Sequence, residues 1–207
     1  RSGGGNGAPA ASGLSASLLG LGHQLGRLKT GTVPRLDGRT IDWARLQPQE
    51  GDHPGGQFSF IGPASPLPAV RCAVARTTEA THAVLREGLR HSPLYGEAAA
   101  IDAVGPRYCP SIEDKIIRFA DKTSHRLFLE PEGLATREVY PNGFSTSLPV
   151  ATQVRAIATI AGLENARIVR PGYAIEYDFA DPQDLDATLQ SSLLPGLFLA
   201  GQINGTT

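Results

Sequence analysis

The sequence has no methionine in 207 residues and only two cysteines, Cys72 and Cys109. The cysteines lie far apart with no CxxC pair, so neither a zinc site nor a disulfide framework is indicated, and we expect no bound metal. A reducing compartment is the default expectation for such a chain. No apolar run approaches the roughly 18 residues that a membrane-spanning helix requires, so we expect no membrane segment.

Two further features that the sequence lacks, a large net charge and a dinucleotide-binding fingerprint, narrow the functions that it can have. The net charge is −1, so the chain has no overall attraction to nucleic acid, and any RNA contact must come from a local patch. No GxGxxG run, the fingerprint of a dinucleotide-binding βαβ unit, occurs in the sequence. The first residue is arginine, which together with the missing methionine suggests an internal piece of a longer protein. We expect this piece to be inactive alone.

The composition is globular and rich in turns, with 41% hydrophobic residues, 24 glycines and 16 prolines. Apolar spacing and helix breakers predict helices near 14–19, over 79–89 after a Thr78 cap, and from 150 to Gly162. Short apolar runs predict strands from Leu25 and at 58–61, 70–74, 115–119, 126–130, 168–169, 173–177 and 197–200. For 115–119 a helix has suitable spacing too, but the β-branched run favours a strand. The mixture predicts an α/β fold, with Cys72 in its core.

The most informative run is residues 105–119, GPRYCPSIEDKIIRF. Its two prolines bracket Arg107, Tyr108 and Cys109, and each fixes its own φ and extends the residue before it. The stiffened loop therefore presents a guanidinium, a phenol and a thiol together. A helical turn opening at Pro110 would place its positive end near the thiol, and with Arg107 this would favour the reactive thiolate. The alternative is that Cys109 is a small buried apolar residue.

Three other places carry polar groups of interest. Arg27, Lys29 and Arg35 lie within nine residues that also hold two threonines, a composition suited to phosphate oxygens. A solvated basic loop is the alternative. Near the end, an apolar strand stops at Gly201, where a backbone without Cβ lets a large ligand approach, and Gln202 follows. Glu130 and Glu132 could act as paired carboxylates, but ion pairs with nearby basic residues are favoured.

Taken together, these motifs resemble the MnmG (GidA) family of flavoproteins. Residues 105–119 match its signature closely, and residues 27–35 resemble its Arg-Leu-Lys-Thr-Gly-Thr-Pro-Pro-Arg motif with Val33 in place of the first proline. Further matches lie at 140–147, at 170–178 and at 200–207, the last being Ala-Gly-Gln-Ile-Asn-Gly-Thr-Thr. The resemblance covers nearly the whole chain and maps it to the middle of the family's chain.

The resemblance implies a two-dinucleotide-binding α/β flavoprotein. Residues 1–35 would end the first segment of the FAD domain, residues 36–168 would form an inserted NAD-associated α/β domain, and residues 169–207 would return to the FAD domain. The implied activity is modification of the tRNA wobble uridine at C5 with a carboxymethylaminomethyl-type group. FAD and NADH would be the cofactors and methylene-tetrahydrofolate the one-carbon source. The partners would be tRNA, an MnmE-type GTPase and a second copy of the chain in a homodimer.

The resemblance also assigns roles to residues. Cys109 would be catalytic, Gln202 would contact FAD, and Arg27, Lys29 and Arg35 would hold phosphates of the substrate. The dinucleotide-binding segment would supply Gly105, Pro106, Arg107, Tyr108, Ser111, Glu113, Asp114, Lys115, Arg118 and Phe119.

Two alternatives remain at this point. One is a folate- and FAD-dependent tRNA uridine-5-methyltransferase, against which residues 107–115 argue. The other is a non-catalytic tRNA-binding scaffold, which departures from the family pattern near Arg76 and Glu87 would favour. The expected location is the cytoplasm of a bacterium, or a mitochondrion or other organelle of a eukaryote.

Overall fold

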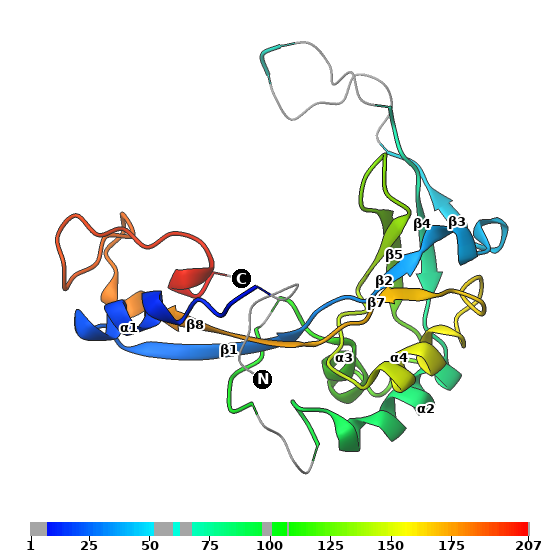
Figure 1. The fold of residues 1–207 in the computed structure, drawn as a ribbon, viewed down its shortest axis with the longest axis horizontal. Coiled ribbons are helices and arrows are strands. Elements are labelled where there is room, and N and C mark those ends of the chain that lie inside the picture. Colours follow the sequence, from blue (N-terminus) through cyan, green and yellow to red (C-terminus); the bar gives the residue numbers. More distant parts are fainter. Residues whose placement is uncertain (1–7, 52–59, 63–67, 97–100, 107, 207) are drawn as a thin grey trace. The chain divides into compact units, whose positions relative to one another are not determined.

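The structure, a computed structural model, describes residues 8–51, 60–62, 68–96, 101–106 and 108–206. The chain forms two compact units (Figure 1). The first gathers residues 1–30, 101–109 and 175–207, and the second gathers residues 31–100 and 110–174. Arg107 and half of the predicted 58–61 strand lie outside the described residues. The predicted domain limits after Arg35 and Ile168 stay a prediction.

The second unit is built on a six-stranded sheet in which every neighbouring pair is antiparallel. The strand order is β3-β4-β5-β6-β2-β7. The strands are β2 (Arg35–Asp37), β3 (Gln47–Gln49), β4 (Cys72–Arg76), β5 (Arg126–Pro131), β6 (Glu138–Asn142) and β7 (Ile168–Arg170). Single 3-10 turns, η2 (Gly38–Thr40), η3 (Trp43–Arg45) and η4 (Leu89–His91), complete the unit. Antiparallel pairing leaves one face of such a sheet free to remain uncovered.

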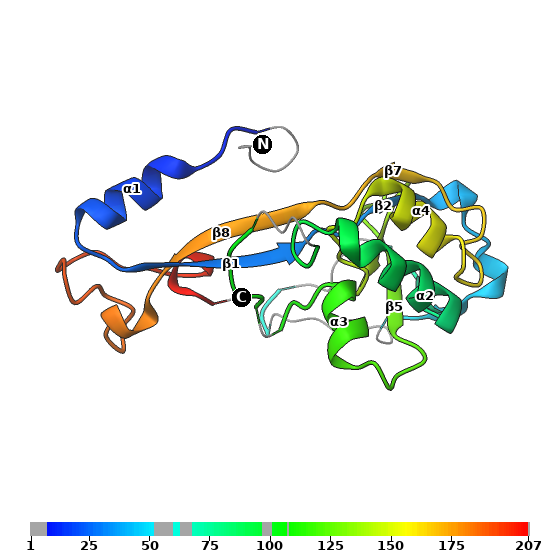
Figure 2. The same ribbon diagram turned by 90° about the horizontal axis from the view of Figure 1, so that it is seen from below.

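Three helices pack on one face of this sheet (Figure 2): α2 (Glu79–Gly88), α3 (Ile112–Arg118) and α4 (Val150–Ile157). Alternate strand residues point toward them, as the period of two in a strand requires. The shared core is formed by buried apolar side chains, among them Leu36, Ala73, Ala75, Leu85, Ile116, Leu127, Leu129, Val139, Phe144 and Ile157. At Gly88 the helices approach so closely that a Cβ would lie 2.6 Å from Thr152 Cγ2 of α4.

The predicted strand at 115–119 is wrong, because residues 115–118 belong to helix α3 and Phe119 is its C-cap. Ser111 caps the helix by accepting from the Asp114 N–H, and the Asp114 side chain accepts from the Ser111 N–H in return. Ile112 and Ile116, four residues apart, are both fully buried on one helical face. The cap and the apolar spacing therefore outweigh the strand preference of β-branched residues. Pro110 precedes this cap, whereas a helical turn was expected to start on it.

The other predicted helices are found, with one shorter than expected. Thr78 forms the capping box of α2 with Thr81, as its position predicted. The helix after Pro149 ends at Ile157, well before Gly162, because tight turns through residues 158–163 replace its last predicted turn. No helix within the described residues combines the length and the apolar character needed to cross a membrane.

The first unit has a two-stranded sheet of β1 (Leu25–Gly31) and β8 (Ala174–Ala180), with helix α1 (Ser12–Gly20). Short turns η5 (Pro182–Asp184) and η6 (Gln202–Asn204) follow β8. A small core forms where Leu18, Ala180 and Leu199 pack together. Gly26 is required by this packing, because a Cβ there would lie 2.5 Å from the ring of Phe179.

Candidate functional site

Cys109 lies on an exposed loop that is fixed to strand β1. The hydroxyl of buried Thr30 donates to the Cys109 carbonyl oxygen at 3.1 Å and lies 4.0 Å from its Sγ. Beside it, the Tyr108 side chain is 78% exposed. The alternative of a buried, apolar Cys109 is therefore wrong. Thr30 was missed as part of this site, although it lies inside the basic motif at residues 27–35.

The backbone just before this loop is attached to the same strand. Val104 forms a parallel bridge with Leu28, with the Val104 N–H donating to the Arg27 carbonyl at 3.0 Å. The Lys29 ammonium donates to the Ile101 carbonyl at 3.4 Å. Gly105 is half-buried and Pro106 buried, so this pair positions the loop more than it offers side-chain contacts.

Arg27 belongs to a charged cluster on the two-stranded sheet. Its Nε donates to Asp178 Oδ1 at 2.8 Å, and a second nitrogen lies 3.4 Å from Glu176. Ser15 donates to the other Asp178 oxygen at 2.6 Å. The Ser15 hydroxyl and the Arg27 guanidinium hold the pKa of Asp178 below its ordinary value. Arg27 is thus exposed, but it is already paired with two carboxylates, which offset its positive charge.

Gln202 and Gly201 form an exposed turn in the first unit. Gly201 has φ +82°, a conformation that favours glycine, and the space where its Cβ would lie is open. The Gln202 side chain donates to the Asp178 carbonyl at 2.8 Å, which orients the turn. An uncovered glycine backbone beside an amide fits the approach of a bulky cofactor such as FAD.

Arg35, in the second unit, is engaged on three sides. Its guanidinium pairs with Glu132, donates to the Val33 carbonyl at 2.6 Å, and stacks on Tyr140 at 4.4 Å from the ring centroid. Arg170 also pairs with Glu132, at 3.2 Å. The expected ion-pair role is confirmed for Glu132, whereas Glu130 instead accepts from the Asn142 amide at 3.1 Å.

The acidic residues of α3 face the interior. Glu113 is fully buried, and its Oε1 accepts from the Ser147 N–H at 2.7 Å, the Ser147 hydroxyl at 2.9 Å and the Thr146 hydroxyl at 3.1 Å. Its Oε2 is buried with no hydrogen-bond partner among the described residues. Burial raises the pKa of Glu113 above its ordinary value, because the charged form is poorly solvated there.

Asp114 and its neighbours also form hydrogen bonds and ion pairs within the protein. Asp114 holds the Ser111 cap with one oxygen, and the Tyr95 hydroxyl donates to the other. Burial, followed by this bond to Asp114, raises the pKa of Tyr95. Lys115 donates to the Gly143 carbonyl at 2.9 Å, and Arg118 lies 3.5 Å from Asp114. Among the described residues predicted to contact a dinucleotide, Tyr108, Arg118 on α3 and Phe119 just after it are exposed, and the others are buried or half-buried. All of these cofactor contacts stay a prediction.

The buried histidine on α2 is satisfied by a hydrogen bond within the protein. His82 is buried on α2, and its Nε2 lies 2.8 Å from the Thr77 hydroxyl. Burial lowers its pKa, since the charged ring would lose solvation. The described residues contain no group of three or more histidine, cysteine, aspartate or glutamate side chains arranged for a metal ion.

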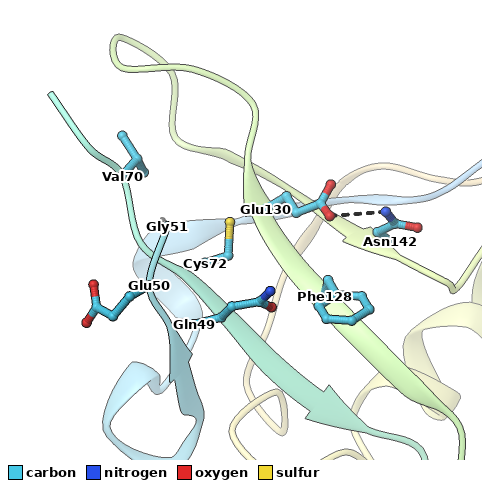
Figure 3. Close-up of a pocket in the computed structure, with 8 residues that line it drawn as sticks. All are labelled: Gln49, Glu50, Gly51, Val70, Cys72, Phe128, Glu130 and Asn142. Atoms are coloured by element: carbon cyan, nitrogen blue, oxygen red, sulfur yellow. Dashed lines mark hydrogen bonds between the residues drawn. The ribbon is translucent and has the colours of Figure 1, made fainter. Parts of the chain in front are cut away.

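Cys72 differs from its prediction, because it is half-buried on the wall of a surface hollow and not in the core (Figure 3). The hollow has a volume of about 390 Å³ and lies on the sheet face opposite the helices. Burial, and to a lesser degree the nearby Glu130 carboxylate, raises the pKa of the Cys72 thiol. Both effects disfavour the reactive thiolate form of Cys72.

The family model described as "Glucose inhibited division protein A" matches residues 1–207. The chain belongs to the GidA family. A crystal structure of GidA from Aquifex aeolicus, in crystal form I, matches with a TM-score of 0.86 and 47% identity over 100% of this chain. The form II structure matches with a TM-score of 0.85 and 44% identity over 99% of this chain.

The match confirms the family resemblance and the mixed α/β fold. The alignment takes in 35% and 32% of the two GidA chains, so this chain spans about a third of their length. The GidA family match includes every motif on which the resemblance was based, because the family model extends over the whole sequence.

Proposed function

We propose that this chain is part of a flavoenzyme that modifies C5 of the tRNA wobble uridine. The observation that carries the proposal is the GidA match over the whole chain, at 47% identity, with the predicted nucleophile Cys109 on an exposed loop. FAD, NADH, methylene-tetrahydrofolate, a GTPase partner and a homodimer belong to the same proposal. Each comes from the family resemblance.

Cys109 is the proposed nucleophile. Its thiolate adds to C6 of the uracil ring, and C5 then forms a bond to a one-carbon electrophile. Loss of the C5 proton to a base restores the C5–C6 double bond and expels the thiolate. The exposure of Cys109 and the Thr30 hydroxyl that fixes its backbone support this role. Preorganising a nucleophile in this way lowers the cost of reaching the reactive geometry.

The turn at Gly201 and Gln202 is the proposed contact with FAD. When bound, FAD would supply the redox chemistry of the reaction. The open backbone at Gly201 leaves room for the cofactor, and Gln202 would add an amide contact. The paired Arg27, together with Lys29 and Arg35, is proposed to orient phosphates through charge-assisted hydrogen bonds.

The test replaces each cysteine in the full gene product. Cys109→Ser should reduce wobble-uridine modification by about a hundredfold or more, the scale of losing one catalytic group. Cys72→Ser is the matched control and should leave the modification near its original level. Nucleoside mass spectrometry of tRNA gives the readout and distinguishes a carboxymethylaminomethyl-type product from 5-methyluridine. Wild-type modification by Cys109→Ser, with the flavin bound, would reject the catalytic role.

A further inference from the structure

The helices cover one face of the six-stranded sheet, and the opposite face carries side chains that the core does not use. We call this surface, over β3, β4, β5 and β6, the open sheet face. Directly opposed residues on neighbouring strands share a face. On the open sheet face these pairs are Gln47–Val74, Gln49–Cys72, Val74–Phe128, Phe128–Asn142 and Arg76–Arg126. Phe128 of β5 therefore lies between Val74 of β4 and Asn142 of β6, and the opposed Arg76 and Arg126 come two residues along β4 and β5.

Two adjoining hollows make this face concave. The first, of about 390 Å³, is the one with Cys72, Glu130 and Asn142 in its lining (Figure 3). The second, of about 230 Å³, is lined by Val74, Arg76 and Arg126. Both are also lined by Gln49 and Phe128, so the two hollows adjoin at these residues. The first hollow has the volume of a small ligand site.

The pair of Arg76 and Arg126 is the feature that the fold itself does not explain. The two residues lie directly opposite each other on β4 and β5, and both are exposed. Like charges in that position destabilise a sheet. Among the described residues neither has a carboxylate within ion-pair distance, whereas many other arginines of this unit do: Arg35, Arg39, Arg45, Arg71, Arg118, Arg155 and Arg170. The unbalanced pair is complementary to an anion.

The side chains around the two arginines suit a nucleotide better than a simple anion, because they add an aromatic surface and polar groups. The Arg126 guanidinium carbon lies 5.9 Å from the centroid of the half-buried Phe128 ring, so cation and aromatic surface adjoin. Sheets that bind single-stranded RNA stack unpaired bases on aromatic side chains and hold the backbone with nearby cations. Gln49 offers its amide to a base edge, and Asn142, whose amide donates to Glu130 at 3.1 Å, forms with that carboxylate a polar pair beside the ring. This carboxylate lies at the end away from the arginines, so it also fixes which end receives the phosphate.

We propose that the open sheet face binds an unpaired nucleotide of RNA, with its base on Phe128 and its phosphates at Arg76 and Arg126. The inference rests on the proposed function, which makes tRNA the substrate, and it adds a contact surface away from Cys109 and Gln202 in the sequence. A polynucleotide is favoured over a free dinucleotide because the surface is an open sheet face, which suits a strand passing across it.

The test measures binding of unmodified tRNA to the full gene product by fluorescence anisotropy at several salt concentrations. The double variant Arg76→Ala with Arg126→Ala should bind about tenfold more weakly and lower the slope of log K against log[salt] by about two, one for each lost phosphate contact. Phe128→Leu should weaken binding about tenfold with little change in slope, because it removes stacking. Arg155→Ala, which removes an exposed arginine from α4, is the control and should bind as wild type does.

Parallel measurements separate this inference from the proposed function. NADH binding and flavin content should be unchanged in all three variants; NADH binding lost while tRNA binding persists would overturn the assignment to RNA. Wild-type tRNA affinity in both open-face variants would overturn the inference and leave the proposed function standing. If the wild type binds no tRNA, the proposed function fails. A single-stranded oligouridylate then tests the surface alone, and its failure to bind overturns the inference too.

Discussion

The run from Gly105 to Phe119 changes character at Pro110. Before it, Tyr108 and Cys109 are exposed and are held through the backbone by strand β1. After it, Ser111, Glu113 and Asp114 are buried and hold a helix and a loop together through side-chain hydrogen bonds. One continuous motif thus contains two kinds of residue. The first half presents exposed side chains, and the second half builds the buried network that anchors helix α3.

The largest stability effect should come from Glu113. Glu113→Ala leaves the Ser147 N–H and two hydroxyls buried without their acceptor, and we expect a loss of about 3 kcal/mol in the free energy of unfolding, given about 1–3 kcal/mol for a buried unsatisfied group. Glu113→Gln keeps an acceptor oxygen and should lose less. Urea denaturation of both variants measures the difference. Equal losses would show that the accepting oxygen does not hold the loop.

The same residue predicts a dependence of stability on pH. The folded protein raises the pKa of Glu113 above the ordinary value of 4.5, so the folded state binds this proton more tightly than the unfolded state. The associated stabilisation is present below pH 4.5 and is lost as the pH rises through the raised pKa. Wild type should therefore lose stability relative to Glu113→Gln as the pH increases. A difference that stays constant from acid to neutral pH would contradict the raised pKa.

An intermediate effect should follow from removing the α3 cap. Ser111→Ala deletes the oxygen that accepts from the Asp114 N–H, and N-cap losses of this kind cost about 1 kcal/mol. Ser111→Thr retains a hydroxyl and is the matched control. Thermal unfolding should show a lower Tm for the alanine variant only. If both variants unfold at the wild-type Tm, the Ser111 cap contributes nothing measurable to the stability of the protein.

The smallest stability effect belongs to the first half of the motif. Thr30→Val removes the hydroxyl that donates to the Cys109 carbonyl while keeping a similar shape, and it should cost about 1 kcal/mol or less. Its effect on tRNA modification should be larger than its effect on stability, because the nucleophile loses its fixed position. Modification rates and Tm measured on the same preparation check this. A variant with a lower Tm but full tRNA modification activity would show that Thr30 has only a structural role.

Local signals in the sequence predicted helices such as α2, but not the long-range hydrogen-bond partners of the buried polar groups. The Thr78 cap and the spacing of α2 depend on neighbours within four residues, so they were found. The same logic applies to Ser111 and α3, but the Ile116–Ile117 pair favoured a strand and hid the helix. The bond from Ser147 to Glu113 joins residues 34 apart, which no local pattern specifies. The opposed arginines on β4 and β5 likewise appear only once the strand register is known.

Alkylation of the native full gene product with iodoacetamide tests most directly whether Cys109 is the nucleophile. The labelling of each cysteine and the tRNA modification activity are measured on the same samples. Cys109 is exposed, whereas the half-buried Cys72 has a raised pKa. We predict that Cys109 is labelled first and that modification activity falls in proportion to its labelling, while the Tm stays unchanged. Full labelling of Cys109 with undiminished tRNA modification activity, or activity lost only as Cys72 reacts, would contradict the role of Cys109 as the nucleophile.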